Sequence, residues 1–192
     1  MLRRTVIAAL LAPGIAWAAC MNEDGAGPFI EQTGRELAAI MAAPDQKAQL
    51  LPFLDRVVDV PGMARFCLGR YWQTATGPER EAYLRLFRAL LANGLSERLA
   101  SSTAKMARVQ TSKPECRGDE IHVPTLVERA YNKPNRIVWV VVNAGTAFRI
   151  VDVTAEGISL RITQRSDTAA FLQRQDGSIG ALVQAMEQKT RG

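Results

Sequence analysis

Few residues of this 192-residue chain have the types and spacing that catalysis or metal binding requires. The only histidine, His122, has no cysteine, histidine or aspartate partner at the spacing of a metal or nucleophile site. The sequence also lacks a glycine-rich phosphate loop, a G-x-S-x-G elbow and a C-x-x-C pair. The acidic residues are scattered and form no convincing acid–base pair; they include Asp45, Asp55, Asp59, Asp119, Glu120 and Asp152. We therefore expect no catalytic residue, no metal site and no cofactor, and we predict that the protein is not an enzyme.

The charge balance raises the question of nucleic-acid binding. Lys and Arg number 24 against 19 Asp and Glu, which gives a net charge of +5, and 47% of the residues are hydrophobic. This composition is that of a folded globular domain. The arginines are spread along the chain and interleaved with acidic residues, a pattern typical of a solvated surface. We therefore exclude nucleic acid as a partner.

The first residues predict export. Arg3 and Arg4 precede an apolar stretch from Thr5 to Ile15, and Ala16-Trp17-Ala18 supplies the small residues of a cleavage site. The apolar stretch is too short for a permanent transmembrane helix. We predict a signal peptide over residues 1–18, cleaved after Ala18, and a periplasmic protein. A lipoprotein modified at Cys20 stays open as a minor alternative.

Three cysteines in an exported chain allow at most one internal disulfide. Cys67 lies within an apolar helical pattern and is interpreted as a buried small hydrophobe. Cys116 lies in a polar loop and is able to reach Cys20 in the flexible lead-in of residues 19–27. A Cys20–Cys116 disulfide is the resulting hypothesis.

Residues 28–192 are predicted to form a single domain whose first half is helical. Apolar residues recur every three or four positions from residue 28 to about 99. Asp59 is a candidate N-cap with Pro61 in the first turn, and Gly69 ends that helix. Thr76-Gly-Pro-Glu79 is a capping box that opens the longest predicted helix.

Beyond Ser101 the period changes to two, which predicts strands over residues 106–112, 120–129, 136–143 and 146–153. Helices over residues 168–173 and 178–189 end the chain. Helices followed by a sheet indicate the α+β class. We predict N-terminal helices packed on a curved antiparallel four-stranded sheet, followed by C-terminal helices.

One predicted strand is apolar on both faces. Residues 137–142 read IVWVVV, so this strand is either covered on both sides or forms one wall of an apolar cavity. Together with the apolar stripe of the 76–99 helix, it suggests an internal cavity for a long apolar ligand between the layers. An ordinary packed core is the alternative.

Two ordered signatures resemble the MlaC family of periplasmic phospholipid-binding proteins, also called toluene-tolerance auxiliary components. The first signature consists of Val58-Asp59, Ala64-Arg65-Phe66, Leu68-Gly69-Arg70-Tyr71-Trp72, Ala75-Thr76, Arg80, Tyr83 and Phe87. The second consists of Ile150-Val151-Asp152-Val153 and Glu156-Gly157-Ile158-Ser159-Leu160, followed by Gly180-Ala181-Leu182-Val183 in the last helix. The resemblance covers most of residues 29–187.

The resemblance implies a lipid carrier with an apolar pocket for the acyl chains of a phospholipid. Such a carrier shuttles lipid between an outer-membrane lipoprotein complex and an inner-membrane ABC transporter complex with its substrate-binding subunit, and so maintains outer-membrane lipid asymmetry. Family members often carry tyrosine where Leu95 and the segment 100–102 stand here, which changes the expected head-group environment and pocket width. A hopanoid-related carrier of the same fold and a periplasmic adaptor with a filled core are the alternatives.

The residues expected to line the pocket are apolar or aromatic side chains of the helices and of the sheet. They are Phe53, Leu54, Val57, Met63, Phe66, Tyr71, Tyr83, Phe87, Leu90, Leu91, Leu95, Val138, Val140, Val142, Phe148, Ile158 and Leu160. Trp139, on the other parity of its strand, is predicted to pack beneath the C-terminal helices. Asp152, Glu156 and Gly157 are predicted to fix the turn after the last strand, with a positive φ at Gly157. The surface arginines either face partners or anionic head groups or are simply solvated; these are Arg65, Arg70, Arg80 and Arg85.

Overall fold

The computed structural model describes residues 23–100, 106–129, 134–145 and 147–191. The predicted signal peptide and Cys20 lie outside these residues. The signal peptide, the lipoprotein alternative and the Cys20–Cys116 pairing therefore stay predictions. Cys116 takes part in a disulfide bond, whereas Cys67 is a buried free thiol. No helix of the described ranges is long and apolar enough to cross a membrane.

The N-terminal half is helical, as predicted. After a short 3-10 turn, η1 (Glu23–Gly25), come α1 (Ala26–Ala42), α2 (Gln46–Val57), α3 (Val60–Leu68), α4 (Tyr71–Thr74) and α5 (Gly77–Ala100). Asp59 caps α3, and its side chain accepts a hydrogen bond from the Gly62 backbone N–H at 3.0 Å. In the capping box of α5, the Thr76 N–H donates to Glu79 Oε2 at 2.8 Å, and the Glu79 N–H donates to Thr76 Oγ1 at 3.4 Å. Both predicted helix starts are confirmed.

The cap of α3 requires glycine at position 62. A Cβ at this position would overlap the Asp59 carboxylate, so the capping side chain would have to move away. We expect Gly62→Ala to lower the free energy of unfolding by about 1–2 kcal/mol, measured by urea denaturation, because the cap is lost. Gly94→Ala is the matched control, since nothing lies within 4 Å of its Cβ position in α5. The control is expected to raise stability by about 0.5–1 kcal/mol, and an equal gain for Gly62→Ala would contradict the role of the cap.

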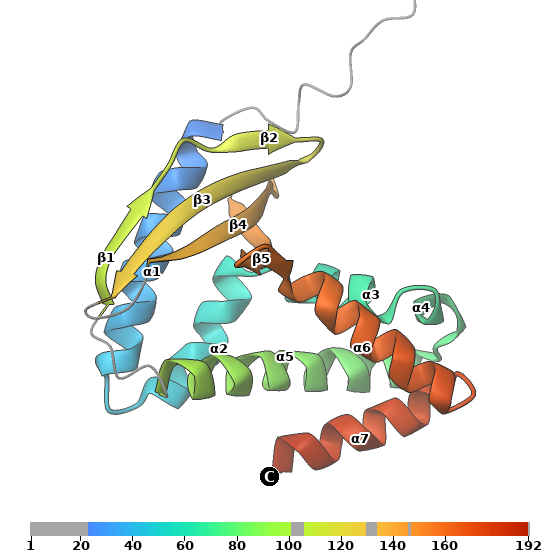
Figure 1. Cartoon of the computed structure of the whole chain (residues 1–192). Helices are drawn as coiled ribbons and strands as arrows, with labels where there is room; N and C mark the ends of the chain where they lie inside the picture. Colours follow the sequence, from blue (N-terminus) through green and yellow to red (C-terminus); the bar gives the residue numbers. More distant parts are fainter. Residues whose placement is uncertain (1–22, 101–105, 130–133, 146, 192) are drawn as a thin grey trace, which may run out of the picture.

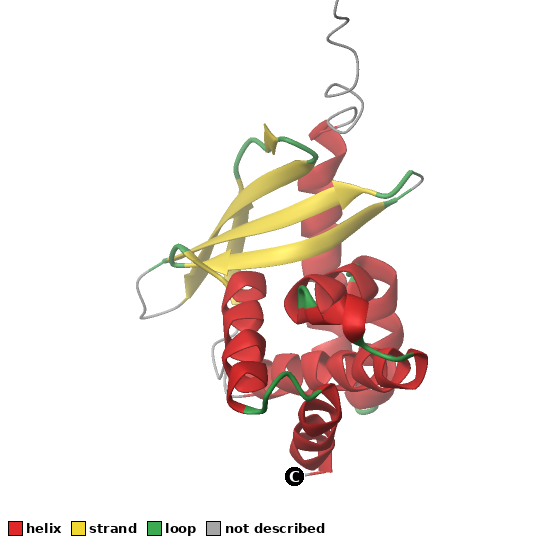
Figure 2. Ribbon diagram, turned by 90° about the vertical axis from the view of Figure 1, so that its right-hand side faces the viewer, coloured by secondary structure: helices red, strands yellow, loops and turns green. Residues whose placement is uncertain are grey.

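The second half builds an antiparallel sheet. Its strands are β1 (Met106–Thr111), β2 (Glu115–Arg117), β3 (Glu120–Arg129), β4 (Asn135–Asn143), β5 (Phe148–Ala155) and β6 (Ile158–Ser159). Their order is β1-β3-β4-β5-β6, and β2 pairs with β3 beside β1. The four predicted strands are confirmed, and the short strands β2 and β6 add two to the predicted sheet. Register shifts in the β1–β3 and β4–β5 pairs accompany the curvature seen in Figure 2.

The chain ends in α6 (Leu160–Arg174) and α7 (Ile179–Arg191). The predicted helix over 168–173 is too short, because α6 begins directly after β6. Its first turn is capped by Ser159, whose Oγ accepts a hydrogen bond from the Ile162 N–H at 3.0 Å. A polar run, Thr163 to Asp167, hides this first half from a search for apolar periodicity.

The helices cover one face of the sheet and extend beyond its edge. In Figure 1, α1 runs behind β1 and β3, α2 stands beneath β5, and α5 crosses below the sheet, with α7 lowest. α6 packs against α3, and α7 packs against α5. This arrangement confirms the α+β class and places the core between the sheet and helices α1, α2, α3 and α5.

Candidate functional site

The sheet supplies one wall of the interior. Ile121 and Val123 on β3 are fully buried, and register pairs them with Val141 and Trp139 on β4. Directly paired residues of an antiparallel sheet project from the same face. All four side chains belong to the hydrophobic core cluster or pack against it, together with Ile150 of β5. This face of the sheet is therefore the one that the helices cover.

Three predicted pocket residues lie on the opposite face. Val138 pairs with Pro124, and Val140 pairs with His122, so they alternate with the core residues of their strand. Val142 shares their parity, and none of the three valines belongs to the core cluster. The predicted orientation of β4 is therefore wrong. Because this strand is apolar on both faces, its sequence alone does not specify which face meets the helices.

Trp139 is correspondingly on the inner face. Its indole N–H donates to Thr125 Oγ1 at 3.1 Å, and the Thr125 hydroxyl donates to the Ile137 carbonyl at 3.2 Å. Thr125 is only 2% exposed, so this chain of bonds satisfies polar groups inside the core. The tryptophan thus packs against the main core rather than beneath α6 and α7.

The helices supply the other wall, and most of the predicted residues reach it. The buried members of this wall come from α2 and α5: Phe53, Leu54, Val57, Tyr83 and Phe87. Further predicted residues are partly buried and pack against them: Met63, Phe66, Tyr71, Leu91, Leu95 and Phe148. The ring of Phe148 also meets Phe29 of α1, with 5.7 Å between the centroids. Leu90 is half-buried and lies outside this cluster.

Two predicted pocket residues are on the surface. Ile158 of β6 is 62% exposed, and Leu160 in the first turn of α6 is 41% exposed. β6 has only two residues and lies at the edge of the sheet, so its side chains have few neighbours to cover them. Neither residue contributes to the interior between the layers.

The sequence prediction omitted several wall residues. Ile121, Val123 and Ile150 form the sheet side of the core, and Leu68 is fully buried on α3. The alternation of residues 121–127 was a usable signal, because only every second side chain there is buried. Two surface hollows, of about 360 and 380 Å³, are lined only by α1, α2 and the turn between them. The apolar pocket between the layers therefore stays a prediction.

One phenol lies within this wall. Tyr83 is 1% exposed, and burial raises the pKa of its hydroxyl far above the ordinary value, with nearby Cys67 adding to the effect. Its hydroxyl makes no geometrically complete hydrogen bond within the described residues, although Thr168 is near enough to oppose the pKa shift. The phenol is therefore neutral, and its hydroxyl lies near Cys67 of α3 and Thr168 of α6.

The thiol of Cys67 is expected to be unreactive. Burial raises its pKa from 9.0 to about 11, because the charged thiolate is poorly solvated on α3. Two pKa units lower the thiolate fraction about a hundredfold at pH 8. We expect a Cys20→Ser/Cys116→Ser variant to react with a disulfide reagent at least about a hundredfold faster in urea than when folded. Equal rates in the two states would show that Cys67 is accessible.

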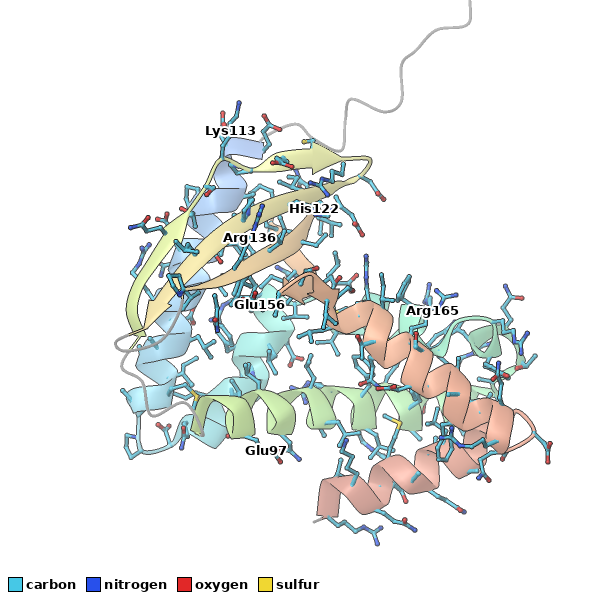
Figure 3. All side chains as sticks on the ribbon, viewed as in Figure 1. Glu97, Lys113, His122, Arg136, Glu156 and Arg165 are labelled. Atoms are coloured by element: carbon cyan, nitrogen blue, oxygen red, sulfur yellow. The ribbon has the colours of Figure 1, made fainter. Side chains whose placement is uncertain are left out.

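The turn between β5 and β6 is shaped by residues of the second signature. Gly157 has a φ of 83°, as predicted, and Glu156 has a φ of 50°. The Glu156 side chain accepts a hydrogen bond from the Arg136 backbone N–H at 3.1 Å; both residues are labelled in Figure 3. This bond ties the turn to the start of β4.

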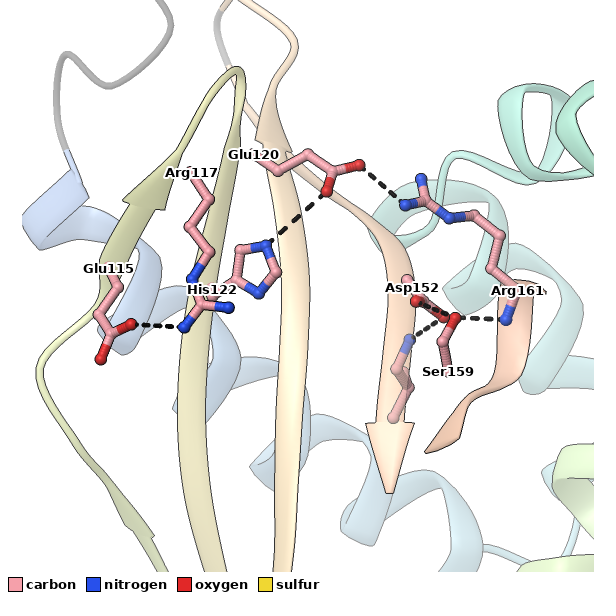
Figure 4. Close-up of polar contacts among 8 residues, drawn as sticks. Glu115, Arg117, Glu120, His122, Asp152, Ser159 and Arg161 are labelled. Carbon is pink, nitrogen blue, oxygen red and sulfur yellow. Dashed lines mark hydrogen bonds and ion pairs between the residues drawn. The ribbon is translucent and has the colours of Figure 1, made fainter. Parts of the chain in front are cut away.

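A buried carboxylate then attaches α6 to the sheet. Asp152 is 3% exposed and accepts hydrogen bonds from the Ser159 hydroxyl at 2.5 Å and from the Arg161 N–H at 2.9 Å (Figure 4). The Arg161 guanidinium reaches Glu120 Oε1 on β3 at 2.9 Å. His122 Nε2 lies 3.8 Å from the same carboxylate, but burial and then Arg117 lower the pKa of the imidazole. Asp152 thus fixes the chain that follows β5, as predicted, and this network stabilises the fold.

Comparison with known proteins identifies the family. A family model described as MlaC protein matches residues 32–188, which is most of the chain. The chain belongs to the MlaC family. The match spans both signatures and every described element from α2 to α6.

A solved structure shares the MlaC fold seen here. It is a phospholipid-binding protein from Ralstonia solanacearum, determined in complex with a phospholipid. The TM-score is 0.71 at 19% sequence identity, and the match covers 86% of this chain and 97% of the other. At this identity the comparison establishes the fold, and the α+β architecture of this MlaC chain is the same as that of the Ralstonia protein.

Proposed function

We propose that this protein is a periplasmic carrier that binds phospholipid, with the acyl chains held between the sheet and the helices. The observation that carries the proposal is the structural match between this MlaC-family chain and the Ralstonia protein, which was solved with phospholipid bound. The match covers 97% of the Ralstonia chain. Binding and transport, rather than catalysis, are what such an arrangement would perform.

The walls of the interior have the chemistry that acyl chains require. They consist of aliphatic and aromatic side chains from β3, β4, β5, α2 and α5. Each methylene left in water would cost roughly 0.8 kcal/mol, so a carrier that takes lipid from a bilayer must offer the acyl chains an apolar environment.

Family membership supports a wider role for the carrier. In this role it would exchange lipid with an outer-membrane lipoprotein complex and with an inner-membrane ABC transporter complex and its substrate-binding subunit. The result would be the maintenance of outer-membrane lipid asymmetry. A strain lacking the gene is then expected to expose more phospholipid to a phospholipase added outside the cells. Unchanged exposure would argue against this role while leaving lipid binding intact.

Lipid binding itself is tested by loading. Protein stripped of lipid is incubated with phosphatidylethanolamine–phosphatidylglycerol vesicles, separated from them by size, and extracted for phosphate analysis. We expect about one phospholipid per protein molecule to stay with the protein, because the ligand is buried once bound. Protein that leaves the column without phospholipid would overturn the proposal.

A further inference from the structure

Two guanidinium groups of α6 lie against the end of α3. The guanidiniums of Arg161 and Arg165 on α6 each lie 4.6 Å from the centroid of the Phe66 ring. The Arg165 guanidinium also lies over Gly69, where a Cβ would be 3.5 Å from it. Figure 3 shows Arg165 on α6 beside α3. Both arginines thus contact the Phe66 ring, and Arg165 also packs on the backbone at Gly69.

The next two rings along the chain carry further arginines. Trp72 has Arg65 at 5.0 Å and Arg80 at 5.4 Å from its ring. Arg70 lies 5.0 Å from the ring of Tyr71 and donates a hydrogen bond to its hydroxyl at 3.1 Å. The end of α3 together with α4 therefore gathers five guanidiniums on three rings. We call this surface the arginine–aromatic corner.

Most of this charge is not neutralised. Arg161 pairs with Glu120, but Arg65, Arg70, Arg80 and Arg165 make no ion pair with any carboxylate in the described part of the chain. Three arginines elsewhere behave differently: Arg35 of α1 pairs with Glu31, Arg56 of α2 with Glu36, and Arg88 of α5 with Asp55. An aromatic ring orients a guanidinium without cancelling its charge. Arg80 donates hydrogen bonds to the Trp72 and Gln73 carbonyls. The exposed Arg65, Arg70 and Arg165 therefore present most of the positive charge and N–H donors that suit phosphate groups.

An apolar component accompanies the charge. Ile162 is 57% exposed and precedes Arg165 by three residues on α6, so the two side chains are neighbours on the helix surface. Tyr71 and Trp72 are only partly buried. Arginine, tryptophan or tyrosine, and an exposed aliphatic side chain are the combination that favours the interface of a bilayer. An acidic protein surface would match the charge but would leave the exposed isoleucine in contact with polar groups.

From this juxtaposition we infer that the arginine–aromatic corner docks the protein on the surface of a bilayer that contains anionic phospholipid. The inference rests on the proposed function, for which it supplies a place where the carrier meets its lipid source. The guanidiniums contact lipid phosphates, and Ile162 and the Trp72 ring lie at the level of the head groups. Each arginine near an anionic surface contributes about 1 kcal/mol of binding free energy, and salt screens this attraction. Binding is therefore weak, reversible and dependent on salt.

Vesicle flotation tests this inference with the full protein. We expect the protein to float with vesicles of phosphatidylcholine and phosphatidylglycerol at low salt, and to stay at the bottom with phosphatidylcholine alone or at high salt. The Arg65→Gln/Arg70→Gln/Arg165→Gln variant should bind the anionic vesicles about a hundredfold more weakly, at roughly fivefold for each arginine. The Arg35→Gln/Arg56→Gln/Arg88→Gln variant removes the same charge from α1, α2 and α5 and should lose less than about threefold.

Three outcomes would overturn the inference. They are equal flotation of the protein with neutral and anionic vesicles, equal losses of binding in the two variants, and no flotation of the protein with either kind of vesicle. A corner that binds an acidic protein instead would give the third outcome. Circular dichroism shows whether each variant is folded, and a Lys substitution at the same three positions restores the charge if folding fails. The lipid content of the purified variants separates this test from the proposed function. A protein that contains phospholipid but does not float with anionic vesicles would contradict only the proposed docking surface.

Discussion

Replacing Asp152 with alanine is expected to lower the free energy of unfolding by about 3 kcal/mol. The buried carboxylate accepts three hydrogen bonds, from the Val153 N–H at 2.8 Å, the Ser159 hydroxyl at 2.5 Å and the Arg161 N–H at 2.9 Å. Alanine would leave these donors without their acceptor and would detach the first turn of α6 from β5. Urea denaturation followed by circular dichroism measures the change.

Asp167→Ala is the control for this loss. Asp167 is an exposed carboxylate on the same helix, so its removal changes the charge by the same amount without exposing a buried donor. We expect a change of at most about 0.5 kcal/mol for the control. A similarly small change for Asp152→Ala would mean that the network in Figure 4 does not stabilise the fold. Asp152→Asn keeps an acceptor oxygen and should recover part of the loss.

Leu91→Asp is expected to reduce the phospholipid content of the purified protein by more than about tenfold. Leu91 lies on α5 and packs against the core from the helical wall. A carboxylate at this position would face acyl chains, and the free energy of burying an unpaired charge is several kcal/mol. The lipid is extracted from equal amounts of the variant and of the unchanged protein and is quantified by phosphate analysis.

Asn93→Asp tests the same charge on the same helix, two residues away and exposed. We expect it to keep its phospholipid. Leu91→Asn introduces a polar group without charge and serves if Leu91→Asp fails to fold. Full lipid content in a folded Leu91→Asp protein would place the acyl chains away from α5 and would contradict the proposed site.

Helix starts were the most predictable feature of the fold. Asp59 and Thr76 act on backbone groups within three residues, so the sequence around them contains the whole signal. The start of α6 was missed because its cap, Ser159, is the last residue of a two-residue strand and its first turns are polar. The short strand β2 has a similar explanation, because three residues are too few to show alternation.

The candidate site was only partly predictable, since burial depends on tertiary contacts. Apart from Leu90, the predicted residues of α2 and α5 belong to the core or pack against it, because each helix has one apolar stripe. β4 has apolar residues on both faces, and the choice between Val140 and Val141 depended on which face the helices cover. Ile158 and Leu160 are apolar yet exposed, which no periodicity reveals.

The family assignment and the fold leave one central claim to be measured, which is that the interior holds phospholipid. The protein is purified from its native compartment without detergent, extracted with organic solvent, and the extract is analysed by mass spectrometry against a known amount of protein. We predict phospholipid in about equimolar amount, as expected for a single buried ligand. Hopanoid in place of phospholipid would favour the alternative of a hopanoid-related carrier of the same fold. An extract without lipid, from a protein that also takes up none from vesicles, would contradict the account and favour an adaptor with a filled core.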